Sequence, residues 1–145
     1  MADSSGDRSS LSLEGRVAVV TGGTKGIGRA IARTLLEARA TVVVCARSEP
    51  ETLPSFGGRA AEFVACDVRK AEECRALVEG VAARHGRLDL LVNNAGGSPA
   101  AEAATASPRF SEAIVALNLI APIHLSQAAH GVMAKQDDGG AIVNI

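Results

Sequence analysis

The sequence contains neither tyrosine nor tryptophan, and its three phenylalanines make the aromatic content only 2% of 145 residues. A hydrophobic core must therefore be built from Ala, Val, Leu and Ile, which an apolar fraction of 47% allows. The length corresponds to one domain or part of one.

The sequence also lacks an excess of charge of either sign. Its formal net charge is −1, and the Lys and Arg residues are scattered along the chain. Domains that bind nucleic acids usually carry a basic patch, and anionic membranes attract clustered basic residues. We therefore expect neither partner, and we see no segment that approaches the length of a membrane span.

Cysteine is scarce and unpaired. Cys45, Cys66 and Cys74 form an odd set without a paired spacing, which predicts reduced thiols rather than a disulfide framework. No cysteines or histidines have the spacing of metal ligands, so we expect no metal site. Residues 1–10 are polar and lack the apolar core of a signal peptide, which predicts a disordered tail and a cytoplasmic protein.

Strand and helix patterns alternate along residues 11–145, which we interpret as one domain. Strands are predicted over residues 16–21, 41–45, 60–66, 88–93 and 141–145, helices over 27–38, 70–85 and 111–134, and a loop over 48–59. In the first helix, Ile27, Ile31 and Leu35 are expected on one apolar face. Continuously apolar strands joined by helices predict an α/β fold with a parallel sheet covered on both faces.

The first strand leads directly into Thr21-Gly22-Gly23-Thr24-Lys25-Gly26-Ile27-Gly28. The spacing G-x-x-x-G-x-G differs from the common G-x-G-x-x-G fingerprint, and no Gly-Lys-Ser/Thr follows as in a P-loop. Glycines let the backbone approach a pyrophosphate, and the start of the next helix offers free N–H groups to the anion. Taken alone, an ordinary glycine-rich turn is the alternative interpretation.

Three further motifs follow in order: Asp67-Val68, Asn93-Asn94-Ala95-Gly96 and Asn118. Together with the glycine turn they resemble the short-chain dehydrogenase/reductase family over about residues 11–145. The resemblance implies a Rossmann-like, doubly wound parallel sheet with strand order 3-2-1-4-5, incomplete at its C-terminal end. It also implies an oxidoreductase that acts on an alcohol or carbonyl, as a homo-oligomer in its full-length form.

The resemblance implies the residues that bind the cofactor. These are Thr21, Gly22, Thr24, Lys25, Gly26, Ile27, Gly28, Arg47, Asp67, Val68, Asn94, Ala95 and Gly96. Asp67 is expected to contact the adenine, although an N-cap of the following helix is an alternative role for it. The stretch from Asn94 to Gly96 is expected to approach the nicotinamide ribose.

The end of the second strand favours NADP(H) over NAD(H). Ala46 stands where enzymes of the NAD type carry an aspartate for the ribose hydroxyl, and Arg47 follows it. The guanidinium of Arg47, with Lys25 in the glycine turn, suits a 2′-phosphate. The alternative is that both cations are solvated surface residues, and Glu49 near the ribose would favour NAD.

Asn118 matches the catalytic asparagine of the family, whose main-chain carbonyl holds a water of the proton relay. Pro122 has no N–H to donate to that carbonyl, so it frees the carbonyl or simply bends the helix. The catalytic Ser, Tyr and Lys of the family have no counterparts in these 145 residues. We expect the chain alone to be inactive, and the alternative function is a non-catalytic dinucleotide-binding module.

A sheet that ends at the fifth strand should leave that strand as an exposed apolar edge. The long helix over 111–134 should likewise lack a neighbour and expose an apolar stripe. Both features predict that the isolated chain is prone to aggregation or poorly ordered near its C-terminus.

Overall fold

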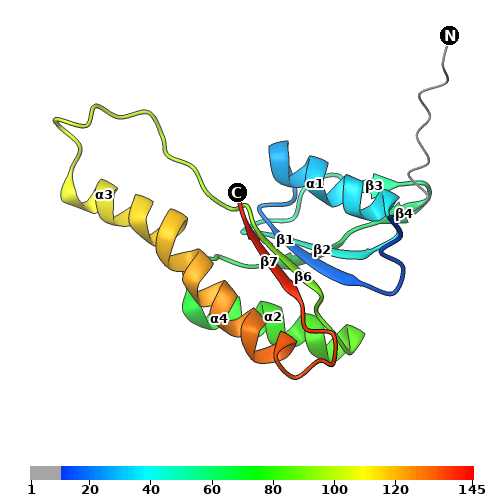
Figure 1. Ribbon diagram of the computed structural model, residues 1–145. Helices are drawn as coiled ribbons and strands as arrows, with labels where there is room; N and C mark the ends of the chain where they lie inside the picture. The colour runs from blue at the N-terminus through cyan, green and yellow to red at the C-terminus, as the bar shows by residue number, and fades with distance from the viewer. Residues whose placement is uncertain (1–10) are drawn as a thin grey trace, which may run out of the picture.

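Five parallel strands form a single sheet in the order β5-β2-β1-β6-β7 (Figure 1). The computed structural model describes residues 11–145, so the predicted tail lies outside the described residues. The strands are β1 (Val17–Thr21), β2 (Thr41–Ala46), β5 (Glu62–Ala65), β6 (Leu90–Asn93) and β7 (Ala141–Asn144). Counted in chain order, this is the predicted 3-2-1-4-5 arrangement, which is confirmed.

Helices cover both faces of the sheet, with α1 on one face and α2 and α4 on the other (Figure 1). The helical segments are α1 (Gly26–Glu37), α2 (Ala71–His85), α3 (Pro108–Val115), the π-helical turn η2 (Ala116–Ile120) and α4 (Ala121–Met133). Neighbouring residues of one strand point to opposite faces, so Val20 packs on the α1 side and Val19 on the other. The fold is the expected doubly wound α/β arrangement.

The buried row of α1 differs from the predicted one. Ile27 is 66% exposed, whereas Ile31 and Leu35 are partly buried. The buried residues of this helix are Gly28, Ala32 and Leu36. Two adjacent rows of apolar residues along a helix have the same spacing in the sequence. Which of the two rows is buried depends on the side of the helix that lies closest to the sheet.

The predicted loop over residues 48–59 contains a small hairpin beside the main sheet. β3 (Ser55–Phe56) and β4 (Arg59–Ala60) pair in antiparallel fashion. Gly57 and Gly58 lie between them with φ values of 56° and 80°, which glycine adopts without strain. Strands of two residues are too short to leave an alternating pattern in the sequence.

The longest helical segment, Pro108–Met133, is long and apolar enough to cross a membrane by length and composition alone. This corrects the expectation that no segment approaches that length, because no Asp, Glu, Lys or Arg occurs between residues 113 and 133. A single helix of this kind is weak evidence, since core helices of soluble proteins pass the same test. Ala121 and Leu125 are buried in the same core as the sheet and α2, so we interpret the segment as a sheet-covering helix.

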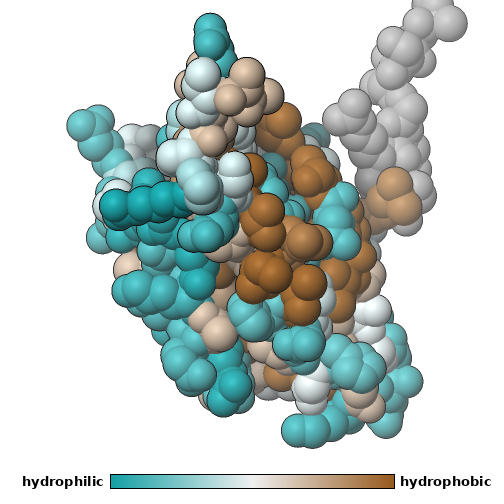
Figure 2. Space-filling model, turned by 90° about the vertical axis from the view of Figure 1, so that its left-hand side faces the viewer, coloured by the Kyte–Doolittle hydropathy of each residue, from teal (hydrophilic) through white to brown (hydrophobic). Residues whose placement is uncertain are grey.

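Large apolar side chains nevertheless remain exposed on this helix and near the C-terminus. Figure 2 shows apolar side chains gathered on the side of the molecule where α3 lies in Figure 1. The exposed residues here are Val115, Leu119, Ile120, Ile123, Ile142, Val143 and Ile145. β7 is also an edge of the sheet, paired only with β6. The expected apolar stripe and exposed edge strand are confirmed.

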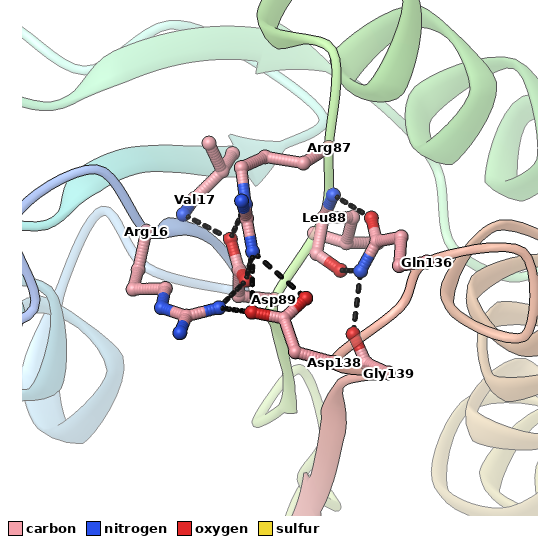
Figure 3. A network of polar contacts seen from close by, with 8 residues as sticks. All are labelled: Arg16, Val17, Arg87, Leu88, Asp89, Gln136, Asp138 and Gly139. Carbon is pink, nitrogen blue, oxygen red and sulfur yellow. Dashed lines mark hydrogen bonds and ion pairs between the residues drawn. The ribbon is translucent and has the colours of Figure 1, made fainter.

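A charged network joins three strands at their amino-terminal ends (Figure 3). The Asp89 carboxylate, just before β6, accepts hydrogen bonds from the Val17 N–H at 2.8 Å, from Arg16 Nη1 at 2.8 Å and from Arg87 Nε at 2.7 Å. Both arginines also pair with Asp138, in the turn before β7. The starts of β1, β6 and β7 are therefore fixed to one another by charge.

Gln136 extends this connection through its side-chain amide. Its Oε1 accepts a hydrogen bond from the Leu88 N–H at 2.8 Å, and its Nε2 donates to the Leu88 carbonyl at 3.0 Å and to the Gly139 carbonyl. The turn that precedes the edge strand is thus held on the main chain before β6 (Figure 3).

We expect the network to make stability dependent on acid pH. Burial by itself raises the pKa of Asp89, but hydrogen bonds from Arg87, Arg16 and the Val17 N–H outweigh burial and hold this pKa at about 2. The pKa of an aspartate in an unfolded chain is about 3.9. A lowered folded-state pKa stabilises above the unfolded value, and this contribution of about 2 kcal/mol disappears as pH falls from about 4 through 2.

Asp89→Asn should accordingly lower the free energy of unfolding by about 2 kcal/mol at pH 7 and flatten its decline between pH 4 and 2. Asp67, whose pKa is also about 2, should preserve part of that decline. Urea unfolding followed by far-ultraviolet circular dichroism measures both effects. Asp137→Asn, at an exposed position in the same turn, is the matched control and should leave the curve unchanged. Equal stability of the wild type and Asp89→Asn at pH 7 would contradict a stabilising role for the network.

The exposed apolar side chains should cause the isolated chain to self-associate, because water-exposed apolar area is covered when molecules meet. We expect the apparent mass in sedimentation velocity to rise with concentration and Ile123→Gln to reduce this rise. Ile27→Gln, which removes an exposed isoleucine on α1, should have a smaller effect. A soluble monomer with a sharp cooperative melt at all concentrations would rule out this expectation.

Candidate cofactor site

The glycine turn joins the end of β1 to the start of α1. Gly22 and Gly26 have φ values of 63° and 54°, in the left-handed region that favours glycine. Lys25 is the N-cap residue of α1, and no side chain caps this helix. The N–H groups of the first helical turn, together with the helix dipole, suit an anion at this end.

The side chains of Thr21 and Asn94 hold this turn against the end of β6. Thr21 Oγ1 accepts hydrogen bonds from the Asn94 N–H at 3.0 Å and the Ala95 N–H at 2.9 Å. Asn94 Nδ2 donates to the Thr21 carbonyl at 3.0 Å and to the Gly22 carbonyl at 3.4 Å. Both predicted residues thus lie behind the site and fix its shape.

This packing leaves no room for a side chain at Gly28. A Cβ atom there would lie 2.4 Å from both Asn94 Nδ2 and the Gly22 carbonyl oxygen. These distances are far below van der Waals contact, so any side chain would push α1 away from the turn. The third glycine of the motif is therefore required for close packing.

A cleft of about 470 Å³ opens beside the turn, at the carboxyl ends of the strands. The predicted residues that line it are Gly22, Thr24, Lys25, Arg47, Asp67, Val68, Ala95 and Gly96. They come from the ends of β1, β2, β5 and β6. In open α/β sheets, ligands bind at this edge.

The end of β2 brings Ala46 and Arg47 to the cleft, opposite Thr24 and Lys25 of the glycine turn. Neither Lys25 nor Arg47 takes part in a salt bridge with any residue of the described part of the chain. Glu49 also lines the cleft. The cleft therefore offers two unpaired cations and one carboxylate, but no acidic side chain at position 46.

Asp67 is held by its neighbours rather than capping a helix. Arg69 donates to its carboxylate from Nε at 2.9 Å and from Nη2 at 2.6 Å, and this pairing lowers the pKa of Asp67 to about 2. The N-cap position of α2 belongs to Lys70. Asp67 is thus ionised at neutral pH, and its remaining lone pairs can accept a further hydrogen bond.

The three cysteines are free and buried, and two of them, Cys45 and Cys66, line the cleft. Interactions with Cys45 and Cys74 lower the pKa of Cys66, whereas the interaction with Cys66, together with burial, raises the pKa of Cys45 and of Cys74. Cys74 Sγ also lies 3.1 Å from the Val68 carbonyl oxygen. The expectation of unpaired, reduced cysteines agrees with this arrangement.

Asn118 lies at a second cleft of about 490 Å³, which shares Ala95 and Gly96 with the first. Its Oδ1 accepts from the Gly97 N–H at 2.8 Å, and its Nδ2 donates to the Gly97 carbonyl at 3.0 Å. The side chain is thus occupied in holding the segment after β6. The family resemblance assigns the role in the proton relay to the main-chain carbonyl of Asn118, and the contacts of its side chain are compatible with that role.

The helix changes its hydrogen bonding around Asn118. The π-helical turn η2 places Asn118 at its centre, and the Ala121 N–H donates to the Ala116 carbonyl five residues earlier. Pro122, which lines the same cleft, cannot donate to the Asn118 carbonyl. Single π-turns of this kind are frequent at functional sites. Pro122 therefore lies directly after a π-helical turn, in the first turn of α4.

The structure does not place every predicted cofactor residue in the cleft lining. Gly26 and Gly28 lie at the helix start behind it, and Ile27 points to solvent. Sequence reasoning also missed two arginines: Arg69, which holds Asp67, and Arg29, which binds main-chain carbonyls on both sides of the cleft rim. Its contacts with Thr52 and Leu53 join residues that are 23 and 24 positions apart, and no local pattern signals them.

Known proteins are similar to this chain in sequence and in fold. The model of the short chain dehydrogenase family matches residues 16–145, and the chain therefore belongs to this family of oxidoreductases. The chain is 38% identical over 140 residues to L-fucose dehydrogenase of Oryctolagus cuniculus, covering 90% of this chain and 46% of that protein. It is 36% identical over 141 residues to 2-dehydro-3-deoxy-D-gluconate 5-dehydrogenase of Escherichia coli, and the match covers 94% of this chain and 55% of that protein.

Solved structures agree in fold. Aldohexose dehydrogenase of Thermoplasma acidophilum, in ligand-free form, matches with a TM-score of 0.80 and 27% identity over 90% of this chain and 49% of that one. A short-chain dehydrogenase from Streptomyces avermitilis matches with a TM-score of 0.80 and 32% identity over 89% and 48%. The chain spans about half the length of the relatives that it matches.

The packing at Gly28 yields a direct test. Gly28→Ala should lower the free energy of unfolding by about 1–3 kcal/mol, because the new methyl group overlaps Asn94 and Gly22. Gly80→Ala, in the middle of α2 with open space around it, should instead raise stability by about 0.5–1 kcal/mol. Thermal and urea unfolding by circular dichroism measure both. A neutral Gly28→Ala variant would disprove the close packing.

Proposed function

We propose that this chain is the cofactor-binding portion of an NADP(H)-dependent oxidoreductase that acts on an alcohol or carbonyl substrate. The observation that carries the proposal is the pair of unpaired cations, Lys25 and Arg47, at a cleft where Ala46 replaces a carboxylate. A ribose that bears a 2′-phosphate is the part of a dinucleotide cofactor that would use both charges.

The remaining residues of the cleft fit a dinucleotide. The glycine turn and the start of α1 would hold the diphosphate, because the N–H groups of the first helical turn have no side-chain cap and are free to bind an anion. Asp67 would accept a hydrogen bond from the adenine amino group, with Val68 beside it. Ala95 and Gly96 would lie against the nicotinamide ribose, where the two clefts meet.

When bound, the nicotinamide supplies the hydride chemistry, and the protein supplies position. Asn118 and Pro122 would prepare the second cleft for proton transfer, since the Asn118 carbonyl cannot receive a hydrogen bond from Pro122. The named relatives include sugar and sugar-acid dehydrogenases, which favours a polyhydroxylated alcohol as the substrate class.

The 145 residues contain no tyrosine, which the family resemblance makes the general acid and base. We therefore propose that the chain alone binds the cofactor without turning over a substrate. This absence also favours the second candidate function, a non-catalytic dinucleotide-binding module. Reading the coding sequence beyond codon 145 separates the two: a Ser followed by Tyr-x-x-x-Lys supports the enzyme, and a stop codon supports the module.

Two further properties are part of the proposal. The free, buried cysteines support a reducing, cytoplasmic location. The exposed apolar side chains of the long helix support a homo-oligomeric full-length form, because such an area is usually covered in an assembly.

The cofactor preference can be tested by titrating NADPH and NADH against the wild-type chain and against Arg47→Ala. We expect the wild type to bind NADPH more tightly, and Arg47→Ala to weaken NADPH about tenfold, or about 1.4 kcal/mol, with less than a twofold change for NADH. Isothermal titration calorimetry measures all four affinities.

Lys25→Ala should also weaken NADPH binding, but by less than Arg47→Ala, because the ammonium group of a lysine lacks the forked geometry of a guanidinium. Glu49→Gln serves as the control of opposite sign and should strengthen NADPH binding, since it removes a carboxylate from the cleft. Equal affinities of the wild-type chain for NADPH and NADH would refute the preference for NADP(H).

A further inference from the structure

Arg29 lies in the first turn of α1 and makes four hydrogen bonds to neutral oxygen atoms. Its Nη1 donates to the Thr24 carbonyl at 3.3 Å and to the Thr52 carbonyl at 2.8 Å. Its Nη2 donates to Thr52 Oγ1 and to the Leu53 carbonyl, both at 3.3 Å. Within residues 11–145, as the structure describes them, no carboxylate pairs with this guanidinium.

These bonds connect the two walls of the candidate cofactor cleft. Thr24 belongs to the glycine turn, whereas Thr52 and Leu53 end the segment that follows β2. That segment, residues 47–53, contributes Arg47 and Glu49 to the cleft and is largely exposed. We name it the β2 loop.

The β2 loop has few other anchors. It begins after Ala46, the last residue of β2, and it ends before Pro54, which is fully buried and accepts a hydrogen bond from the Ala61 N–H at 2.8 Å. Leu53 packs partly against the core under α1. At Thr52 and Leu53, the last two residues of the loop, the guanidinium of Arg29 joins the loop to Thr24 of the glycine turn.

We infer that Arg29 is a positioning residue for cofactor selectivity: it holds Arg47 at the distance from Lys25 that a 2′-phosphate requires. This inference rests on the proposed function. A cofactor without the 2′-phosphate would not use both cations, so its affinity should depend little on the position of the β2 loop. Loss of Arg29 should therefore weaken NADPH more than NADH.

The shape of the side chain, and not only its charge, should matter. A guanidinium presents five N–H donors in a rigid plane and can bind carbonyls of two segments at once. An ammonium presents three donors on one nitrogen and cannot reproduce the fork. Arg29→Lys keeps the charge and removes the fork, which separates an electrostatic effect on the anion from the positioning of the loop.

The experiment compares Arg29→Met and Arg29→Lys with Arg33→Met. Arg33 lies one turn further along α1, is exposed, and carries the same charge, so its variant controls for charge loss on this helix. Calorimetric titration of each variant with NADPH and NADH gives the ratio of the two dissociation constants. We expect the preference for NADPH to fall about five- to tenfold in both Arg29 variants and to change less than twofold in Arg33→Met.

A second readout is independent of the cofactor. Cleavage by a Glu-specific protease after Glu51, which is exposed in the β2 loop and is followed by Thr52, reports how firmly the loop is held. The cleavage rate should rise several-fold in both Arg29 variants and stay unchanged in Arg33→Met. Thermal unfolding by circular dichroism shows whether each variant is folded, and Arg29→Lys provides the test if Arg29→Met is not.

The possible results separate this inference from the proposed function. Equal affinity of the wild-type chain for the two cofactors overturns the proposed function and the role of Arg29 in selectivity together, while the protease rates still report on the contact itself. A wild-type preference that survives in Arg29→Met overturns this inference alone. If Arg29→Lys keeps the wild-type ratio of dissociation constants, the charge of residue 29 is responsible and not its position. If Arg33→Met loses as much preference for NADPH as Arg29→Met, the loss of charge on the helix is responsible. Either result overturns the inference.

Discussion

The structure depends on one close contact, in which the glycine turn after β1 packs against the main chain after β6. Four hydrogen bonds make this contact, and each involves Thr21 or Asn94. Gly28 permits the contact because it presents no side chain. The contact sets the separation of two strand ends. It also places Ala95 and Gly96 between the two clefts, so that both clefts share a rigid wall. The position of a ligand in either cleft would therefore depend on this contact.

The two ends of the strands differ in how their charges are compensated. At the amino-terminal end, Arg16 and Arg87 are neutralised by Asp89 and a second carboxylate, and this end serves stability. At the carboxyl end, Lys25 and Arg47 form no salt bridge within residues 11–145, so both charges are available to attract an anion. Substitutions that change stability should therefore fall at the amino-terminal ends of the strands, and substitutions that change binding should fall at their carboxyl ends.

Much of this organisation could be predicted from the sequence: the alternation of strands and helices indicates a parallel sheet, and the family resemblance of the motifs implies the strand order and the residues at the strand ends. What could not be predicted depends on contacts between distant segments. The buried row of α1 was misassigned at Ile27, since two adjacent rows share one period. The bonds from Arg29 to Thr52 and Leu53 leave no signal in spacing. The apolar length of Pro108–Met133 was underestimated because scattered polar residues interrupt a helix that carries almost no charge.

The bond between α1 and the loop after β2 also bears on how such sites are modified. The loop, residues 47–53, looks like a replaceable surface segment, because it is short and exposed. Its anchor, however, is a side chain of the preceding helix, 23 residues earlier in the chain. A loop transplanted from a relative would bring its own charges but not the arginine that orients them. Grafts between members of this fold should therefore move the helix start and the loop as one unit.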